Sequence, residues 1–182
     1  MVIGPESTGK SFLCEQLAAH YNTVWVKEYA REYLLKNGAG YTFETLLDIA
    51  KGQIANEQLI VGRWPLAGMK STDKRSVGSD QFLFIDTDMY VMKIWCEFVF
   101  ERTHHWILNR IAERKYDLYL LCNIDLPWAK DELREYPDLE SREALYKMYK
   151  DAIVNQPVPW VDISGNNEER LQKAVKAVDA LT

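Results

Sequence analysis

"GPESTGKS" at residues 4–11 follows a short apolar run and decides the fold class of the chain. The segment fits the pattern G-x-x-x-x-G-K-[ST] in full, with Gly4, Gly9, Lys10 and Ser11 at its fixed positions. Backbone N–H groups in such a loop can converge on a phosphate chain because no bulky side chain blocks the approach. The segment, called the phosphate loop below, is therefore predicted to bind a nucleotide. A glycine turn without a ligand is the alternative.

The residues of the phosphate loop have separate expected roles. Gly9 allows a tight turn into a helix predicted from about residue 10 to 21, whose N-terminus contributes its positive dipole end. Lys10 is expected to reach the outer phosphates, and the hydroxyl of Ser11 to bind Mg²⁺. ATP and Mg²⁺ are the predicted cofactors. The ATP-binding residues predicted here are Gly4, Glu6, Ser7, Thr8, Gly9, Lys10, Ser11 and Phe12.

Apolar runs alternate with amphipathic segments along the rest of the chain. Runs that are apolar throughout are typical of parallel strands covered on both faces, so a layered α/β domain is predicted. Besides the short run before Gly4, the predicted strands are residues 23–29, 82–86, 118–123 and 158–164. The predicted helices are residues 10–21, 30–38, 42–60, 88–102, 106–114, 139–154 and a last one capped by Asn166 and Glu169.

Length and composition bound the class of protein. The 182 residues, 47% of them hydrophobic, suit one compact domain spanning 1–182. The net charge of −5 argues against a nucleic-acid-binding surface, and no run is apolar enough to span a membrane. No signal peptide is apparent, so a cytoplasmic protein without nucleic-acid or membrane partners is expected. Cys14, Cys96 and Cys122 lie in apolar stretches and are expected to be buried free thiols; a homo-oligomer is left open.

Two acids follow the apolar run "FLFI" and are candidates for the chemistry. Asp86, at the carboxyl end of the predicted strand, is expected to bind Mg²⁺ through water and so to support phosphoryl transfer. Asp88 lies two residues further on. Capping of the following helix is an alternative role for either acid.

Glu28 lies at the end of the second predicted strand. Because the carboxyl ends of parallel strands line the ligand crevice, its carboxylate is placed to take a proton from a substrate hydroxyl. An ion pair with Arg31 is the alternative, and both roles can hold at once.

Two segments are expected to move or to lie outside the regular structure. Arg134 and Arg142 belong to a charged segment at about 125–142, called the lid segment below, whose arginines are expected to close over the phosphates and exclude water. A solvated charged face is the alternative. Residues at about 61–81 are predicted to form a long loop, either a substrate flap or an exposed excursion.

Several segments together resemble one family. "GPESTGKS", "KEYAREYL" (27–34), "IAKGQ" (49–53), "FIDTD" (84–88) and "DLPWAKDELRE" (125–135) occur in the order seen in the ribosylnicotinamide kinase domain of NadR-type proteins. The resemblance implies a three-layer P-loop nucleoside kinase fold with a five-stranded parallel sheet. It also implies ATP-dependent phosphorylation of the 5′-hydroxyl of nicotinamide riboside, a small-molecule substrate, to give nicotinamide mononucleotide.

The resemblance also implies roles for single residues. Lys10 and Ser11 serve phosphate and Mg²⁺, and Arg134 belongs to the lid. Lys27 stands where the family carries a tryptophan, so a kinase for another nucleoside or small hydroxyl compound is an alternative, and so is a regulatory ATPase. The residues implied to lie near the substrate are Glu28, Tyr29, Arg31, Asp88, Trp128 and Asp131.

Overall fold

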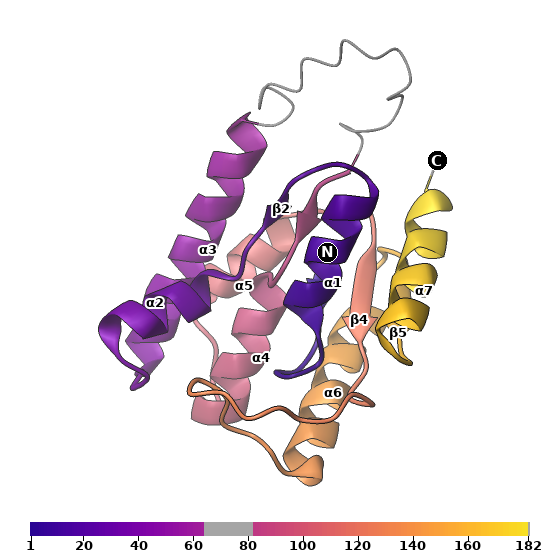
Figure 1. Cartoon of the computed structure of the whole chain (residues 1–182). Coiled ribbons are helices and arrows are strands. Elements are labelled where there is room, and N and C mark those ends of the chain that lie inside the picture. The colour runs from indigo at the N-terminus through magenta and orange to yellow at the C-terminus, as the bar shows by residue number, and fades with distance from the viewer. Residues whose placement is uncertain (64–81, 182) are drawn as a thin grey trace.

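The computed structural model describes residues 1–63 and 82–181 of the chain (Figure 1). The strands are β1 (Val2–Ile3), β2 (Trp25–Val26), β3 (Phe84–Ile85), β4 (Tyr119–Cys122) and β5 (Trp160–Ile163). The helices are α1 (Lys10–His20), α2 (Tyr29–Asn37), α3 (Phe43–Arg63), α4 (Met89–Phe100), α5 (His105–Glu113), α6 (Leu139–Val154) and α7 (Asn167–Asp179).

All strand pairs are parallel, as the apolar runs predicted. β1, β4 and β5 form a three-stranded sheet, and β2 and β3 form a second, two-stranded one. One bridge, between Val2 and Asp86, connects the two. The expectation of a single five-stranded sheet was therefore wrong in this respect. β1 and β3 have only two residues each, because the chain turns away at Gly4 (φ 141°) and Thr87 (φ 75°), so no longer ladder can form between them.

Helices cover both faces of the strands, and alternate residues of one strand serve opposite sides. Val2 packs with Leu17 of α1 and Val178 of α7, whereas Ile3 packs with Ile94 of α4 and residues of α6. A third apolar cluster joins α2, α3, α4 and α5. The resulting arrangement is three-layered, and it brings the loops that follow the strands to one end of the molecule.

Local signals in the sequence set several helix ends. Thr42 accepts a hydrogen bond from the N–H of Thr45 at the start of α3, and Gly38 (φ 97°) ends α2. Asn166 and Glu169 form the predicted capping box of α7. The predicted burial of Cys14, Cys96 and Cys122 as free thiols is confirmed.

The predicted long loop begins later than expected. Residues 61–63 form the last turn of α3, because the helical pattern continues through Arg63. The remainder of that prediction, residues 64–81, lies outside the described residues. Within the parts of the chain that are described, no helix combines the length and the apolar character that a bilayer crossing needs.

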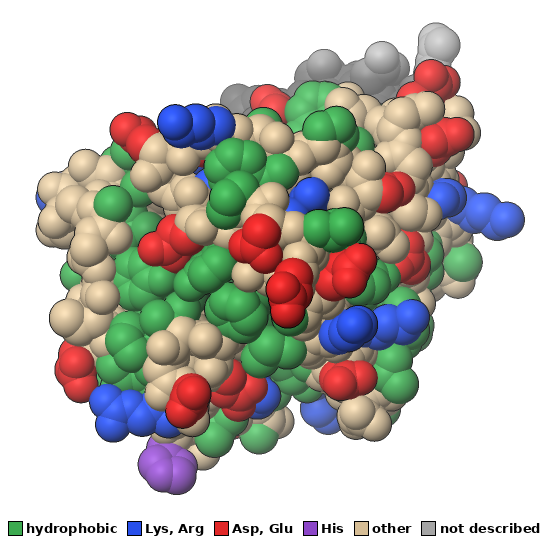
Figure 2. All heavy atoms as spheres, turned by 90° about the horizontal axis from the view of Figure 1, so that it is seen from below, with side chains coloured by type: hydrophobic (Ala, Val, Ile, Leu, Met, Phe, Trp, Pro, Cys, Tyr) green, Lys and Arg blue, Asp and Glu red, His purple; other side chains and the backbone are tan. Residues whose placement is uncertain are grey.

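The lid segment is irregular over residues 125–138, and its last residues form the first turn of α6. In Figure 1 it crosses the lower end of the molecule. Figure 2 shows the molecule from that side, where acidic side chains lie among exposed hydrophobic ones.

Candidate functional site

A cavity of about 470 Å³ lies between the phosphate loop, α2 and the lid segment. Residues 4–12 line one end of it, Glu28 and Arg31 one wall, and Asp131 and Arg134 the side toward the lid. The structure thus brings together most of the residues that the sequence singled out. Tyr29, Asp86, Asp88, Trp128 and Arg142 are not among the lining residues.

The phosphate loop has the backbone conformation of an anion site. Gly9 is left-handed (φ 79°) directly before α1, and Ser7 has a φ of 56°. At Gly4 a Cβ atom would lie 2.7 Å from the carbonyl oxygen of Cys122, so the loop can approach β4 only with glycine there. Thr8 is fully buried, and its hydroxyl donates to the carbonyl of Pro5 at 2.7 Å. The side chain of Lys10 donates to the same carbonyl at 2.9 Å.

Ser11 and Asp86 meet beneath the phosphate loop. The Ser11 hydroxyl donates to Asp86 Oδ2 at 2.5 Å, and the carboxyl group is fully buried. Burial, with the charge of Glu28 as a second cause, raises the pKa of Asp86 to about 6. The described residues hold no cluster of three or more His, Cys, Asp or Glu that could bind a metal alone. One hydroxyl and one carboxylate fit Mg²⁺, which keeps several waters and takes its remaining ligands from substrate phosphates.

Thr87 connects the two carboxylates of the site. Its hydroxyl lies 3.3 Å from Glu28 Oε1 and 3.5 Å from Asp86 Oδ1. The residue has a left-handed φ of 75°, which is uncommon for a β-branched side chain and is typical of strained functional segments. Glu28 is thereby oriented at the cavity wall beside the Ser11–Asp86 pair.

Two residues implied to contact the substrate serve the fold instead. Asp88 caps α4 by accepting from the N–H groups of Tyr90 and Val91, and it accepts from the hydroxyl of Tyr119 at 3.1 Å. The capping alternative therefore holds for Asp88. Tyr29 packs its ring against Gly52, and its N–H donates to the side chain of Gln53 at 2.7 Å. Neither side chain reaches the cavity in this structure.

Arg31 joins the wall of the cavity to the lid segment. Its guanidinium donates to both carboxylate oxygens of Asp131, at 3.1 and 3.0 Å. Among the described residues Arg31 forms its ion pair with Asp131, and the alternative pairing with Glu28 is not seen. The carboxylate of Glu28 is therefore not occupied by this arginine.

The carboxylate of Glu6 binds the lid segment. It accepts from the N–H groups of Glu135 (2.9 and 3.1 Å) and Tyr136 (2.6 Å), and from the indole of Trp128 at 3.4 Å. The hydroxyl of Ser7 also accepts from the N–H of Ala129 at 2.9 Å. These contacts close the lid segment against the phosphate loop, which is a role that the loop pattern alone does not indicate.

The two lid arginines differ in position. Arg134 lines the cavity and donates to the carbonyl of Ala129 at 2.5 Å. Arg142 is buried, and its guanidinium donates to the carbonyls of Ile124 and Leu126, both at 2.9 Å. The prediction that Arg142 contacts ATP is corrected accordingly, because its Nη2 is bound to the backbone at the start of the lid segment and the residue does not line the cavity.

An aromatic and aliphatic chamber extends the cavity away from the phosphate loop. The rings of Phe98 and Tyr136 meet edge to face with centroids 5.0 Å apart, and Trp95 meets Tyr41 in the same way at 4.8 Å. Sequence reasoning missed this chamber because aromatic residues at helical spacing indicate a core face, and nothing local separates a core from a cavity wall. The lining residues that were missed are Ala30, Leu34, Val91, Trp95, Phe98, Leu133, Glu135, Tyr136, Leu145 and Tyr149.

The raised pKa of Asp86 predicts how the metal-free protein responds to pH. A carboxyl group with a folded pKa of about 6 binds more protons in the folded than in the unfolded state between about pH 4 and 6. Its contribution to stability is complete below about pH 4 and is lost as the pH rises through 6. The amide introduced by Asp86→Asn would not titrate, so we expect the free energy of unfolding of this variant to fall less between about pH 4 and 7 than that of the parent, by up to about 2–3 kcal/mol.

The measurement is urea unfolding of parent and variant from pH 4.5 to 7.5 in the presence of a chelator. The difference between the two unfolding free energies isolates Asp86 from the other carboxyl groups, and exposed Glu143→Gln is the control. Parallel pH profiles for parent and Asp86→Asn would contradict the expected shift.

Comparison with known proteins agrees with the geometry. The AAA domain family AAA_28 matches residues 1–170. The trifunctional NAD biosynthesis/regulator protein NadR of Salmonella typhimurium is 25% identical over 89% of this chain and 37% of its own length. NadR of Escherichia coli is 24% identical over 97% of this chain and 41% of its own length. The chain therefore spans about two fifths of the curated relatives that it matches.

Two solved structures have the same fold. A NadR protein in complex with NR superposes with a TM-score of 0.73 at 21% identity, over 98% of this chain and 49% of that one. A NadR protein in complex with NAD and AMP-PNP gives 0.71 at 22% identity, over 98% and 48%. The α/β P-loop fold and the resemblance to NadR proteins are thereby confirmed.

Proposed function

The chain belongs to the AAA domain family, and from this membership and its site we propose that it is an ATP-dependent kinase that phosphorylates the 5′-hydroxyl of nicotinamide riboside to nicotinamide mononucleotide. The observation that carries the proposal is the cavity itself, which joins the phosphate loop and the carboxylate of Glu28 to an aromatic chamber, with the Ser11–Asp86 pair beside it. Proteins of similar fold bind NR, NAD and AMP-PNP. Residues 1–182 are taken as one kinase domain with its lid segment.

The donor end of the cavity suits a triphosphate. The N–H groups of residues 6–11 supply backbone donors, and Lys10 and Arg134 supply positive charge near the outer phosphates. Ser11 and Asp86 would hold Mg²⁺, which when bound neutralises charge on the phosphate oxygens. The lid segment, closed on Glu6 and Ser7, excludes water from the same end.

The acceptor end places a base beside the donor end. Glu28 lines the cavity, and the hydroxyl of Thr87 donates to one of its oxygens at 3.3 Å. The second carboxylate oxygen of Glu28 is left to accept the proton of the substrate hydroxyl while the hydroxyl oxygen attacks the phosphorus of the donor. The proposal thus assigns Glu28 as general base and leaves Asp88 to the capping of α4.

The chamber supports an aromatic and positively charged base. Lys27, which stands where the family carries tryptophan, is exposed and lies over the ring of Trp25, with 5.7 Å between its ammonium and the ring centroid. Trp95 and Phe98 of α4 and Tyr136 of the lid segment supply the missing aromatic surface. The faces of such rings attract cations, so a pyridinium suits this end better than a neutral apolar group does.

A coupled ADP-release assay over a panel of nucleosides, with nicotinamide riboside included, tests the proposal. ATP turnover should rise strongly with nicotinamide riboside, and mass spectrometry should detect the mononucleotide. If ATP turnover rises with a different nucleoside, that nucleoside is the substrate in place of nicotinamide riboside. If no acceptor increases turnover, the protein is a regulatory ATPase.

Removal of the Glu6 carboxylate is expected to uncouple the lid segment from the phosphate loop. Glu6→Ala takes away the acceptor of three lid donors, and each such bond contributes about 1 kcal/mol. We expect the ratio of ATP hydrolysis to nucleoside phosphorylation to rise about tenfold or more, because water then reaches the phosphates.

Phosphate and mononucleotide release are measured in parallel. Glu132→Ala is the control, since this lid residue makes none of the contacts to Glu6 or Ser7. An unchanged ratio in Glu6→Ala would show that these contacts do not govern access of water.

A further inference from the structure

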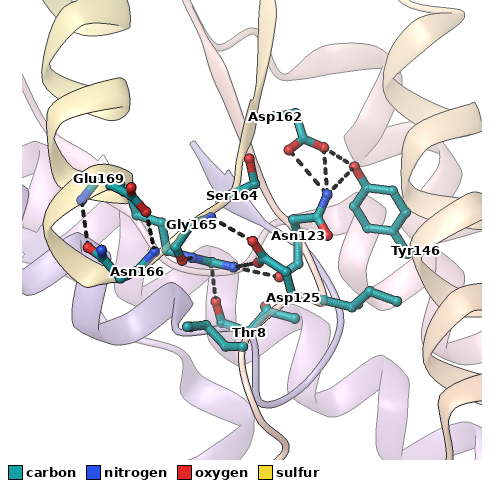
Figure 3. A network of polar contacts seen from close by, with 12 residues as sticks. Thr8, Asn123, Asp125, Tyr146, Asp162, Ser164, Gly165, Asn166 and Glu169 are labelled. Carbon is teal, nitrogen blue, oxygen red and sulfur yellow. Dashed lines mark hydrogen bonds and ion pairs between the residues drawn. The ribbon is translucent and has the colours of Figure 1, made fainter.

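Arg170, in the first turn of α7, lies between the phosphate loop and the start of the lid segment. Its guanidinium is buried, with 3% of the residue exposed, and it connects three loops. Nη1 donates to the carbonyl of Thr8 at 2.9 Å, Nε to that of Gly165 at 2.7 Å, and Nη2 to that of Asn123 at 2.9 Å. Nη2 also pairs with the carboxylate of Asp125. Figure 3 shows Thr8, Asn123, Asp125 and Gly165 gathered in this network.

The sequence holds Arg170 at this point through the capping of its helix. The side chain of Asn166 accepts from the N–H groups of Glu168 and Glu169, and that of Glu169 accepts from the N–H of Asn166. Asp125 in turn accepts from the N–H of Gly165 at 2.6 Å. The start of α7 is therefore fixed, and the arginine one residue beyond the capping box has a set direction.

A contribution to stability does not by itself explain why a buried arginine occupies this position. A buried ion pair loses about as much in desolvation as it gains in attraction, and apolar residues of similar volume often replace it without loss. A guanidinium, however, can direct several carbonyl groups at once, which an apolar side chain cannot do. Its contact with Thr8 is to a residue of the phosphate loop.

Because the peptide group is planar, the hydrogen bond from Arg170 to the carbonyl of Thr8 also orients the next N–H group. The carbonyl of Thr8 and the N–H of Gly9 belong to one planar trans peptide, so they point in opposite directions. Arg170 draws the carbonyl toward α7. The N–H of Gly9, a residue that lines the cavity, is thereby directed away from α7 and toward the place of the phosphates.

We propose that Arg170 is a positioning residue for the triphosphate: by fixing the Thr8–Gly9 peptide it sets the affinity for the phosphate chain. The inference rests on the proposed function, because it takes the cavity to bind ATP. Arg170 touches neither donor nor acceptor, and it acts through the loop backbone.

Binding of AMP-PNP and of nicotinamide riboside to separate samples, measured by calorimetry, tests the proposal. Arg170→Ala is expected to weaken AMP-PNP binding by about 10- to 100-fold and to leave riboside binding unchanged, because only the phosphate loop loses its support. Methylguanidinium at millimolar concentration should restore part of the AMP-PNP affinity. Arg114→Met is the control, because it removes a guanidinium that is paired with Glu57 and not with the phosphate loop. This variant should leave both affinities unchanged, and the additive should have no effect on it.

Arg170→Lys provides the test if the alanine variant does not fold. It keeps the charge but cannot reach all the carbonyls, so AMP-PNP binding should weaken at least threefold. Folded Arg170 variants that bind AMP-PNP within threefold of the parent, or that lose both ligands equally, would overturn the proposal. A parent protein that binds no AMP-PNP would instead refute the proposed function.

Discussion

Lys10→Ala is expected to abolish phosphoryl transfer, lowering kcat by about 10³-fold or more. Lys10 is the first residue of α1 and lines the cavity, and its ammonium lies across the loop, 2.9 Å from the carbonyl of Pro5. Among the described residues that line the cavity Lys10 is the lysine, and the other cations, Arg31 and Arg134, are engaged by Asp131 and by the carbonyl of Ala129. The loss should be in the chemical step, where negative charge moves from the transferred group to the leaving oxygen.

Single-turnover transfer from labelled ATP measures this loss directly. Lys36→Ala is the matched control, because Lys36 is exposed in the last turn of α2 and outside the cavity. Thermal unfolding should show that Lys10→Ala remains folded, since one hydrogen bond across the loop contributes only about 1 kcal/mol. A variant that retains more than about a tenth of the parental kcat would show that Lys10 is not required for transfer.

Glu28→Gln is expected to lower turnover by about 10²–10⁴-fold while ATP affinity is retained. The amide keeps the volume of the side chain and an oxygen that can accept from Thr87, but it cannot take a proton. Glu28 is not part of the phosphate loop, so binding of the donor should be preserved. The negative charge of Glu28 raises the pKa of Asp86. Its removal should therefore lower that pKa and favour the ionised form of Asp86.

The kcat at saturating riboside and the Kd of AMP-PNP separate these effects. Glu32→Gln, an exposed residue one turn along α2, is the control. Turnover within a factor of about three of the parent would remove Glu28 from the role of base. In that event the acid next in position is Asp86, which is already engaged by Ser11.

Much of this site could be predicted from short stretches of sequence. The phosphate loop needs glycine where its backbone is left-handed or meets β4, and this need appears directly as Gly4 and Gly9. The apolar run before Asp86 marked a buried strand, and the structure brings its terminal acid to Ser11. The capping pair of α7 was also readable, because its two side chains satisfy N–H groups within three residues.

Other contacts could not be predicted because they depend on which distant segment comes to lie beside a residue. Glu6 meets N–H groups about 130 residues away, Arg142 is directed to the start of its own loop, and Asp88 faces Tyr119. The aromatic chamber of Trp95, Phe98 and Tyr136 combines a helix with the lid segment, so neither segment alone reveals it.

The sequence by itself thus determined the elements, their caps and the phosphate-binding backbone, since these depend on hydrogen bonds and steric limits within a few residues. The tertiary structure alone decided which acid faces the cavity, which arginine supports the phosphate loop and where the aromatic wall comes from. The physical reason is that a side chain's partner is set by the packing of whole helices and strands, and many sequence-distant partners satisfy the same local pattern.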